Sequence, residues 1–98
     1  MKKFSVGQTV RIPCDVQRGA FPTEMLVTLE TAEGPISGFV RAENVVGIKG
    51  HDGFIHATVT DISSDTVTVI LRGSFFTTTG LAYLKRDWAN SHLQAAHA

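Results

Sequence analysis

Three residues of the types that bind metals lie close together in this sequence: His51, Asp52 and His56. The two histidines are separated across a Gly-rich stretch, and their spacing differs from the helical H-x₃-H pair that presents two imidazoles to zinc. We therefore interpret this segment as a solvated loop that leads into a strand. Cys14 is the single cysteine, so the chain cannot form an internal disulfide or a cysteine-based zinc cluster.

The patterns that catalysis requires are missing from the sequence. No serine lies in a nucleophile-elbow context, no histidine has a neighbouring nucleophile, and no Gly-rich phosphate loop leads from a strand into a helix. The nine carboxylates are scattered along the chain, as is typical of solvated strand ends. We predict that the protein is not an enzyme and has no catalytic, cofactor-binding or metal-binding residues.

Basic and aromatic side chains gather near the C-terminus. The set comprises Arg72, Phe75, Phe76, Tyr83, Lys85, Arg86 and Trp88. Small barrels bind single-stranded nucleic acid with such mixtures, by stacking bases on rings and holding phosphates with cations. In the alternative interpretation, Phe75 and Trp88 cover the core and the bases are solvated. The net charge of zero favours the alternative, because affinity for phosphate backbones depends on neutralising several charges.

The strongest structural pattern runs from 54 to 73, where apolar and polar residues alternate on both sides of Ser63-Ser64-Asp65. Such alternation is typical of half-buried strands, so the segment predicts a β-hairpin with Thr68 on its outer face. Side chains alternate between the two faces of a strand, so residues that pair across the hairpin must share a face. This rule predicts the cross-strand pairs Val59–Val69, Ala57–Leu71 and Ile62–Thr66, with an odd number of loop residues. A hairpin with one apolar face is unstable alone, so the rest of the chain must cover it.

Alternation predicts further strands, whose approximate ranges are 9–16, 25–31, 36–42 and 81–84. Pro13 has no N–H group to donate, so one side of the first strand is an edge or a bulge at this point. Three glycines within 47–53 indicate a connection between a first sheet unit, 6–46, and the hairpin with its closing strand, 54–87. A C-terminal helix or tail follows at 88–98, with Asp87 as the candidate N-cap.

Length and composition fit one domain over residues 1–98. A chain of this size with 43% hydrophobic residues buries a modest core without metal or disulfide staples. The basic N-terminus lacks the apolar segment of a signal peptide, and no apolar run approaches the ~20 residues that span a bilayer. We expect a reduced, cytoplasmic setting with no membrane contact.

The segment Gly38-Phe39-Val40-Arg41-Ala42-Glu43-Asn44-Val45 resembles the last strand and the following 3₁₀ turn of SH3-like barrels. The resemblance covers about the first half of the chain and implies a small β-barrel. SH3 domains that bind proline-rich peptides have Pro where this chain has Arg41 and Tyr where it has Asn44. The resemblance therefore does not imply proline-rich ligands.

Together these observations predict an all-β protein, namely a small SH3-like antiparallel barrel of about five or six strands with a short C-terminal helix or tail. We expect a non-catalytic protein-binding or assembly module, and a small-barrel nucleic-acid-binding protein is the alternative. The predicted interaction surface is the C-terminal cluster together with Phe21, which lies beside Pro22 in a loop. The segment from Phe75 to Thr79 has neither proline nor charge, so this edge predicts a two-fold homodimer.

Overall fold

Nine β-strands in one antiparallel sheet account for most of the residues that the computed structural model describes, which are 4–19, 21–71, 74–75 and 80–96. The strands are β1 (Thr9–Arg18), β2 (Glu24–Thr31), β3 (Gly34–Arg41), β4 (Val45–Lys49), β5 (Asp52–Ile62), β6 (Thr66–Leu71), β7 (Ser74–Phe75), β8 (Leu81–Lys85) and β9 (Gln94–Ala95). A 3₁₀ turn, η1 (Ala42–Asn44), precedes β4, and one short helix, α1 (Arg86–His92), follows β8. The predicted all-β class with a short C-terminal helix is confirmed.

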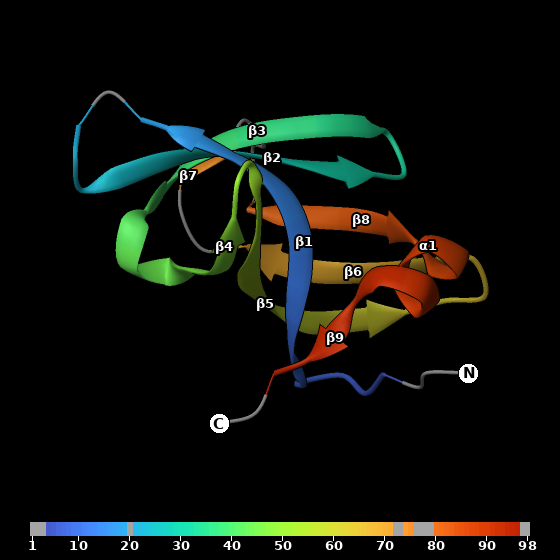
Figure 1. Ribbon diagram of the computed structural model, residues 1–98. Coiled ribbons are helices and arrows are strands. Elements are labelled where there is room, and N and C mark those ends of the chain that lie inside the picture. The colour runs from blue at the N-terminus through green and yellow to red at the C-terminus, as the bar shows by residue number, and fades with distance from the viewer. Residues whose placement is uncertain (1–3, 20, 72–73, 76–79, 97–98) are drawn as a thin grey trace.

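The sheet curls into a small barrel with two layers (Figure 1). Its strand order is β7-β3-β2-β1-β5-β6-β8, with β4 paired to β5 and β9 paired to β1. One layer contains β2 and β3, the other contains β5, β6 and β8, and β1 crosses between them. The β2–β3 turn approaches the edge strand β8, where the Ala32 N–H group donates to the Tyr83 carbonyl oxygen at 2.6 Å.

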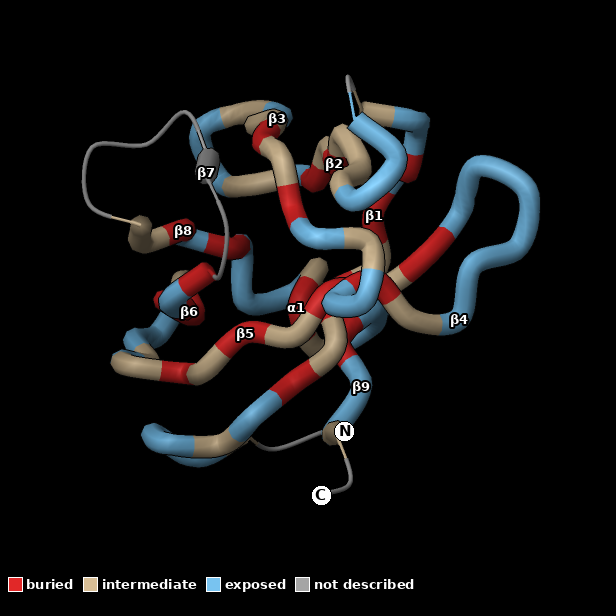
Figure 2. Tube along the Cα trace, turned by 90° about the vertical axis from the view of Figure 1, so that its left-hand side faces the viewer, coloured by how far each residue is buried: buried red, intermediate tan, exposed pale blue. Residues whose placement is uncertain are grey.

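The core lies between the layers and is built from the inward residues of the strands, as the alternation predicts. Figure 2 shows buried segments recurring along the strands that enclose this interior. Burying a branched aliphatic side chain stabilises a fold by roughly 1.5–3 kcal/mol. The largest side chains that are fully buried are Ile12, Ile55, Leu84, Leu93, Val10, Val27, Val40, Val59, Val67 and Val69.

The hairpin of β5 and β6 confirms two predicted pairs, Ala57–Leu71 and Val59–Val69, and contradicts the third. Ile62 lies opposite Val67, because Ser63 and Thr66 close a two-residue turn through a 2.8 Å backbone hydrogen bond. A bulge between Val59 and Asp61 then restores the register of the apolar face. The prediction of an odd loop is wrong, since the extra residue lies in the strand and not in the turn.

Thr68 is also placed differently from the prediction. Its exposed fraction is 8%, so this polar residue is buried although it lies on the outer face. β6 is an inner strand of the sheet, and Thr68 lies between Asp61 of β5 and Tyr83 of β8. The Thr60 hydroxyl donates to the Thr68 carbonyl oxygen at 3.3 Å across the bulge. Neighbours on both sides therefore cover a position that the local pattern assigns to solvent.

The Gly-rich segment 47–53, expected to be a connection, contributes to a second hairpin formed by β4 and β5. Gly47 and Gly50 have φ angles of 62° and 64°, a backbone region that glycine adopts without strain. Gly47 lies at the irregularity between Val46 and Lys49, and Gly50 lies in the turn that joins Lys49 to Asp52. Glycines here shape a bulge and a turn.

Helix α1 begins two residues before the predicted start, and Lys85 occupies its N-cap position without a side-chain capping bond. Asp87, the predicted N-cap, lies in the first turn instead. The Arg86 N–H group donates to the Asp65 carbonyl oxygen at 2.9 Å, which ties the helix start to the β5–β6 turn. The helix ends at His92, Leu93 is fully buried, and β9 then pairs with β1. In the part of the chain that the structure describes, no helix is both long and apolar enough to cross a membrane.

Candidate functional site

Strand β1 changes partners along one of its edges, and this change creates the most distinctive hollow of the barrel. One edge pairs with β5 from Thr9 to Asp15. The other edge pairs with β2 from Asp15 to Arg18 and with β9 at Val10 and Arg11. Pro13 falls between these two partners, so the predicted edge at Pro13 is a short gap inside the sheet.

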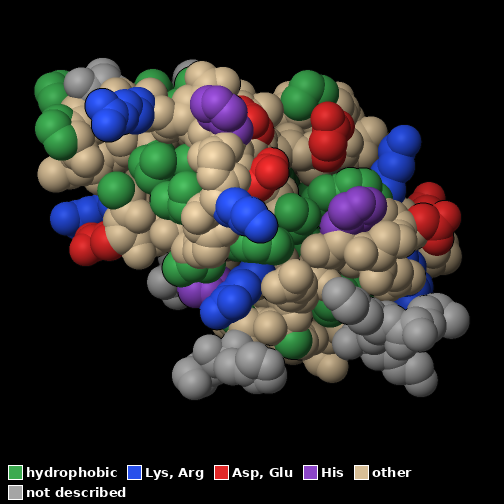
Figure 3. All heavy atoms as spheres, in the orientation of Figure 1, with side chains coloured by type: hydrophobic (Ala, Val, Ile, Leu, Met, Phe, Trp, Pro, Cys, Tyr) green, Lys and Arg blue, Asp and Glu red, His purple; other side chains and the backbone are tan. Residues whose placement is uncertain are grey.

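A groove of about 310 Å³ opens at this gap, and we call it the Trp88 groove. β1, β2, β5 and α1 all contribute to it. Its lining residues are Pro13, Cys14, Asp15, Thr28, Leu29, Glu30, Asp52, Gly53, Phe54, Trp88 and His92. In Figure 3 hydrophobic side chains are visible between acidic and histidine side chains on the face where β1 and α1 lie toward the viewer. The groove therefore combines an apolar surface with charged margins.

Trp88 stands between this groove and a second hollow of about 270 Å³, whose lining residues are Glu30, Thr31, Lys85 and Trp88. The indole is half-buried and packs against the core. The His92 ring stacks on it, with the ring centroids 4.8 Å apart. The His92 Nδ1 atom lies 2.9 Å from the Trp88 carbonyl oxygen; since that oxygen only accepts, Nδ1 is the donor. Both contacts fix the orientation of the aromatic pair.

Acidic side chains outnumber basic ones around Trp88. The carboxylates are Asp15, Glu30 and Asp52, whereas Lys85 is the one lysine or arginine that lines either hollow among the residues that the structure describes. Asp15 and Asp52 lie directly opposite each other in the β1–β5 ladder. Gln17 Nε2 donates to Asp15 Oδ2 at 3.3 Å. Among the described residues, Arg41 and Glu43 form an ion pair and the groove carboxylates form none, although Lys49 of β4 lies opposite Asp52 in the β4–β5 ladder.

Cys14 is one of the lining residues of the groove, and its thiol is unreactive. It is 8% exposed, and its Sγ atom donates a long hydrogen bond of 3.5 Å to the Gly53 carbonyl oxygen. Burial, together with the negative charges of Asp15 and Asp52, raises the pKa of the Cys14 thiol to about 12. The thiol therefore stays protonated at neutral pH, as expected for a small buried hydrophobe.

This raised pKa predicts a loss of stability in alkali. The pKa of Cys14 in the folded state exceeds the ordinary value of 9.0. The protonated thiol therefore contributes fully to the free energy of unfolding below pH 9, and this contribution disappears as the pH rises toward 12. The loss is at most about 1.4 kcal/mol per pH unit in this window. Urea unfolding at several pH values tests it, with Cys14→Val as the control that has no proton to lose. Parallel pH profiles of the two proteins would contradict the prediction.

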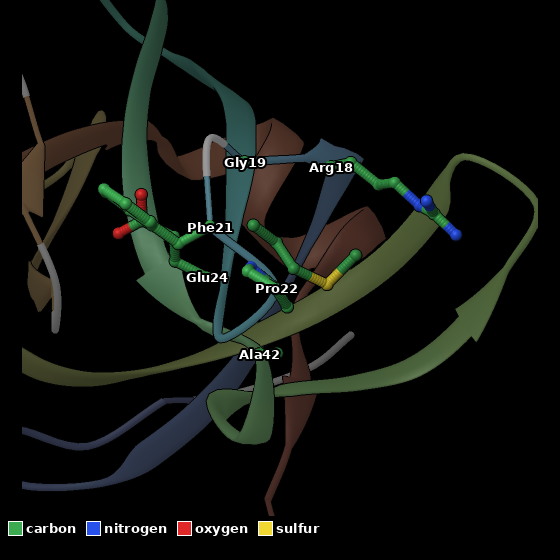
Figure 4. Close-up of a pocket in the computed structure, with 7 residues that line it drawn as sticks. Arg18, Gly19, Phe21, Pro22, Glu24 and Ala42 are labelled. Atoms are coloured by element: carbon green, nitrogen blue, oxygen red, sulfur yellow. The ribbon is translucent and has the colours of Figure 1, made fainter.

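Phe21 belongs to a separate hollow at the tip of the β1–β2 hairpin. This hollow has a volume of about 470 Å³ and is lined by Arg18, Gly19, Phe21, Pro22, Glu24, Met25 and Ala42 (Figure 4). Phe21 is 65% exposed. The site is open and its two charged side chains, Arg18 and Glu24, have opposite signs. Its distinctive feature is therefore one exposed aromatic ring.

The predicted interaction residues divide into several groups. Lys85 and Trp88 share a hollow, and Tyr83 is exposed on the outer face of β8. Arg86 is engaged within the fold, because its Nη1 atom donates to the Ser63 carbonyl oxygen at 2.8 Å. Phe21 lines a different hollow. Arg72, Phe76 and the side chain of Phe75 lie outside the described residues.

Sequence reasoning missed the acidic side of the Trp88 groove. Asp15, Glu30 and Asp52 come from three strands and are far apart in the chain. The alternation did place Asp15 on the outer face of its strand, but the neighbour at Asp52 depends on the β1–β5 register. That register is a long-range property, and the sequence pattern carries no signal for it.

His51, Asp52 and His56 do not gather into a metal site. Within the described ranges, no group of three or more His, Cys, Asp or Glu residues has a geometry that could hold a metal ion. His56 lies opposite Arg11, and the His56 Nε2 and Arg11 Nε atoms are both buried without a hydrogen-bond partner. A cavity of about 20 Å³ borders His56, which is room for about one water molecule.

No protein family, curated protein or solved structure matches this chain. Its function must therefore be argued from its own surface.

Proposed function

We propose that this protein is a non-catalytic module that binds another protein through the Trp88 groove. One observation carries the proposal: a half-buried tryptophan stands between two hollows at a gap in the sheet. Tryptophan contributes strongly to binding when it anchors an interface, because it buries a large area and loses little conformational entropy. Pro13, Leu29 and Phe54 extend the apolar surface beside it.

The charges around Trp88 argue for a protein ligand over the alternative, a nucleic acid. Binding to phosphates requires cations near the stacking ring. Here the same ring is bordered by three carboxylates and one lysine. A negative groove repels a phosphate backbone, so Trp88 is poorly placed as a base-stacking platform.

Selection from a phage-displayed library of random 12-residue peptides tests the proposal. We expect peptides whose binding changes the emission of Trp88, which is the single tryptophan of the chain. Trp88→Ala should abolish binding, whereas Phe21→Ala, at the separate hairpin hollow, should leave it unchanged. Circular dichroism confirms that each variant is folded. Selected peptides that bind Trp88→Ala equally well, or binding of oligo(dT) without any selected peptide, would overturn the proposal.

The predicted two-fold dimer remains part of this proposal. Ser74 and Phe75 pair with Phe39 and Gly38 of β3 within the chain, and 76–79 lie outside the described residues. Light scattering at micromolar concentration should give about twice the chain mass, and a mass near 10.6 kDa would reject the dimer. If a dimer is observed, Phe76→Lys should dissociate it without loss of the strand signal in circular dichroism.

We also propose a cytoplasmic setting and an SH3-like relationship. The free, buried thiol of Cys14 is compatible with a reducing compartment. The strand layout and the η1 turn after β3 are compatible with an SH3-like barrel.

A further inference from the structure

We infer that the Trp88 groove receives a lysine or arginine side chain from an extended segment of the partner protein. The inference rests on the proposed function and specifies the partner's chemistry. It follows from three features of the groove, namely a pair of carboxylates without an ion pair, an apolar wall and the positions of two lysines beside the groove.

The carboxylate pair is the first feature. Asp15 and Asp52 are directly opposite residues in an antiparallel ladder, where side chains lie close enough for like charges to destabilise the sheet. Neither forms an ion pair with a described lysine or arginine. Glu30 adds a third negative charge to the same lining. A cation that enters the groove would relieve this repulsion, so the site is electrostatically complementary to a basic group.

The apolar wall is the second feature. Pro13 and Phe54 lie opposite each other in the β1–β5 ladder. Each is two residues along its strand from Asp15 or Asp52, so the two pairs lie on the same face of the sheet. Leu29 and Trp88 complete the apolar lining. Lysine and arginine have a methylene stem and a charged end, and they pack the stem on apolar surface while the end stays polar. The groove offers both environments within one side-chain length.

The positions of two lysines beside the groove are the third feature. Lys49 of β4 lies opposite Asp52 in the β4–β5 ladder, but it does not line the groove and forms no ion pair with Asp52. Lys85 lines the hollow on the other side of Trp88 but does not line the Trp88 groove. Among the described residues, the lining of the groove therefore contains three carboxylates and no lysine or arginine, which leaves room for a basic group from another molecule. A metal ion is a poor occupant, since these residues form no metal-holding group in the described structure.

The same random peptide library provides the test, with two target proteins. Wild-type protein should enrich peptides that contain lysine or arginine at one position. A variant with Asp15→Lys and Asp52→Lys should lose these peptides and enrich peptides that contain Asp or Glu instead. Circular dichroism establishes that the variant is folded. Trp88-dependent peptides without a basic bias, or the same peptides on both targets, would overturn the inference while the proposed function stands. If no Trp88-dependent peptide is obtained, both fail.

A single substitution separates binding from structure. Asp52→Asn should weaken binding of a selected basic peptide about tenfold, because it removes one charge from the site. The same change should shift the melting temperature little, because it removes both the repulsion from Asp15 and the attraction of Lys49. Asp61→Asn is the matched control, because Asp61 is exposed on the same strand and does not line the groove. Unchanged affinity in Asp52→Asn would contradict a basic ligand.

Discussion

Leu93→Ala should destabilise the protein by about 2–5 kcal/mol, the usual range for deletion of a buried leucine side chain. Leu93 is fully buried between α1 and β9, and its N–H group donates to the Ala89 carbonyl oxygen at 2.9 Å. The free energy of unfolding, measured with urea, gives the effect directly.

This substitution also tests how the Trp88 groove is held in place. Leu93 links the helix that contains Trp88 to the strand that pairs with Val10 and Arg11. We therefore expect the emission of Trp88 to shift to longer wavelength in Leu93→Ala, as the indole becomes more exposed. Gln94→Ala, at the adjacent exposed position, is the control. A wild-type spectrum together with unchanged stability would show that Leu93 does not anchor the helix.

Gly53→Ala is the second substitution for which we expect a large effect, of about 1–3 kcal/mol, which is typical of overpacking. A Cβ atom at Gly53 would lie 2.8 Å from Val16 Cγ2 and 3.2 Å from Val45 Cγ1. The first contact is too short for carbon atoms and the second is tight, so the Val16 and Val45 side chains would have to move. The entropy that alanine removes from the unfolded chain, about 0.4–1 kcal/mol, offsets only part of this cost.

A double-mutant cycle identifies the cause. Val16→Ala removes the methyl group that the new Cβ atom would meet first. The double variant Gly53→Ala with Val16→Ala should therefore be more stable than the sum of the two single effects indicates, by about 0.5 kcal/mol or more. Strictly additive effects, measured by urea unfolding, would exclude a steric clash between these two positions.

The acidic groove also explains why the cluster of basic and aromatic residues in the sequence did not predict the charges around Trp88. That cluster placed Lys85, Arg86 and Trp88 together because they are neighbours in the chain. In the fold, Arg86 turns toward the β5–β6 turn and donates to Ser63, while Trp88 faces carboxylates from other strands. The charge beside an aromatic ring is therefore set by strand pairing, and sequence proximity alone suggests the wrong partner.

The sequence alone predicted the longer strands and many of their inward positions. The period-two alternation is a local property of an extended backbone, so it identified inward positions such as Ala57, Val59 and Val69 without reference to the rest of the fold. It also indicated an interruption at Pro13, because a missing N–H group has the same consequence in any sheet.

Only the tertiary structure decided the register, the turns and the groove. The bulge after Val59 lets a two-residue turn coexist with the predicted apolar face, and parity counting assumes that no such extra residue exists. The positive φ angles of Gly47 and Gly50 build a hairpin where composition indicated a connection. The β1–β5 register places Asp15 opposite Asp52, and Glu30 of β2 lines the same groove, where the pairing of β1 with β2 ends. Such arrangements depend on contacts between segments that are far apart in the sequence, which a local pattern does not encode.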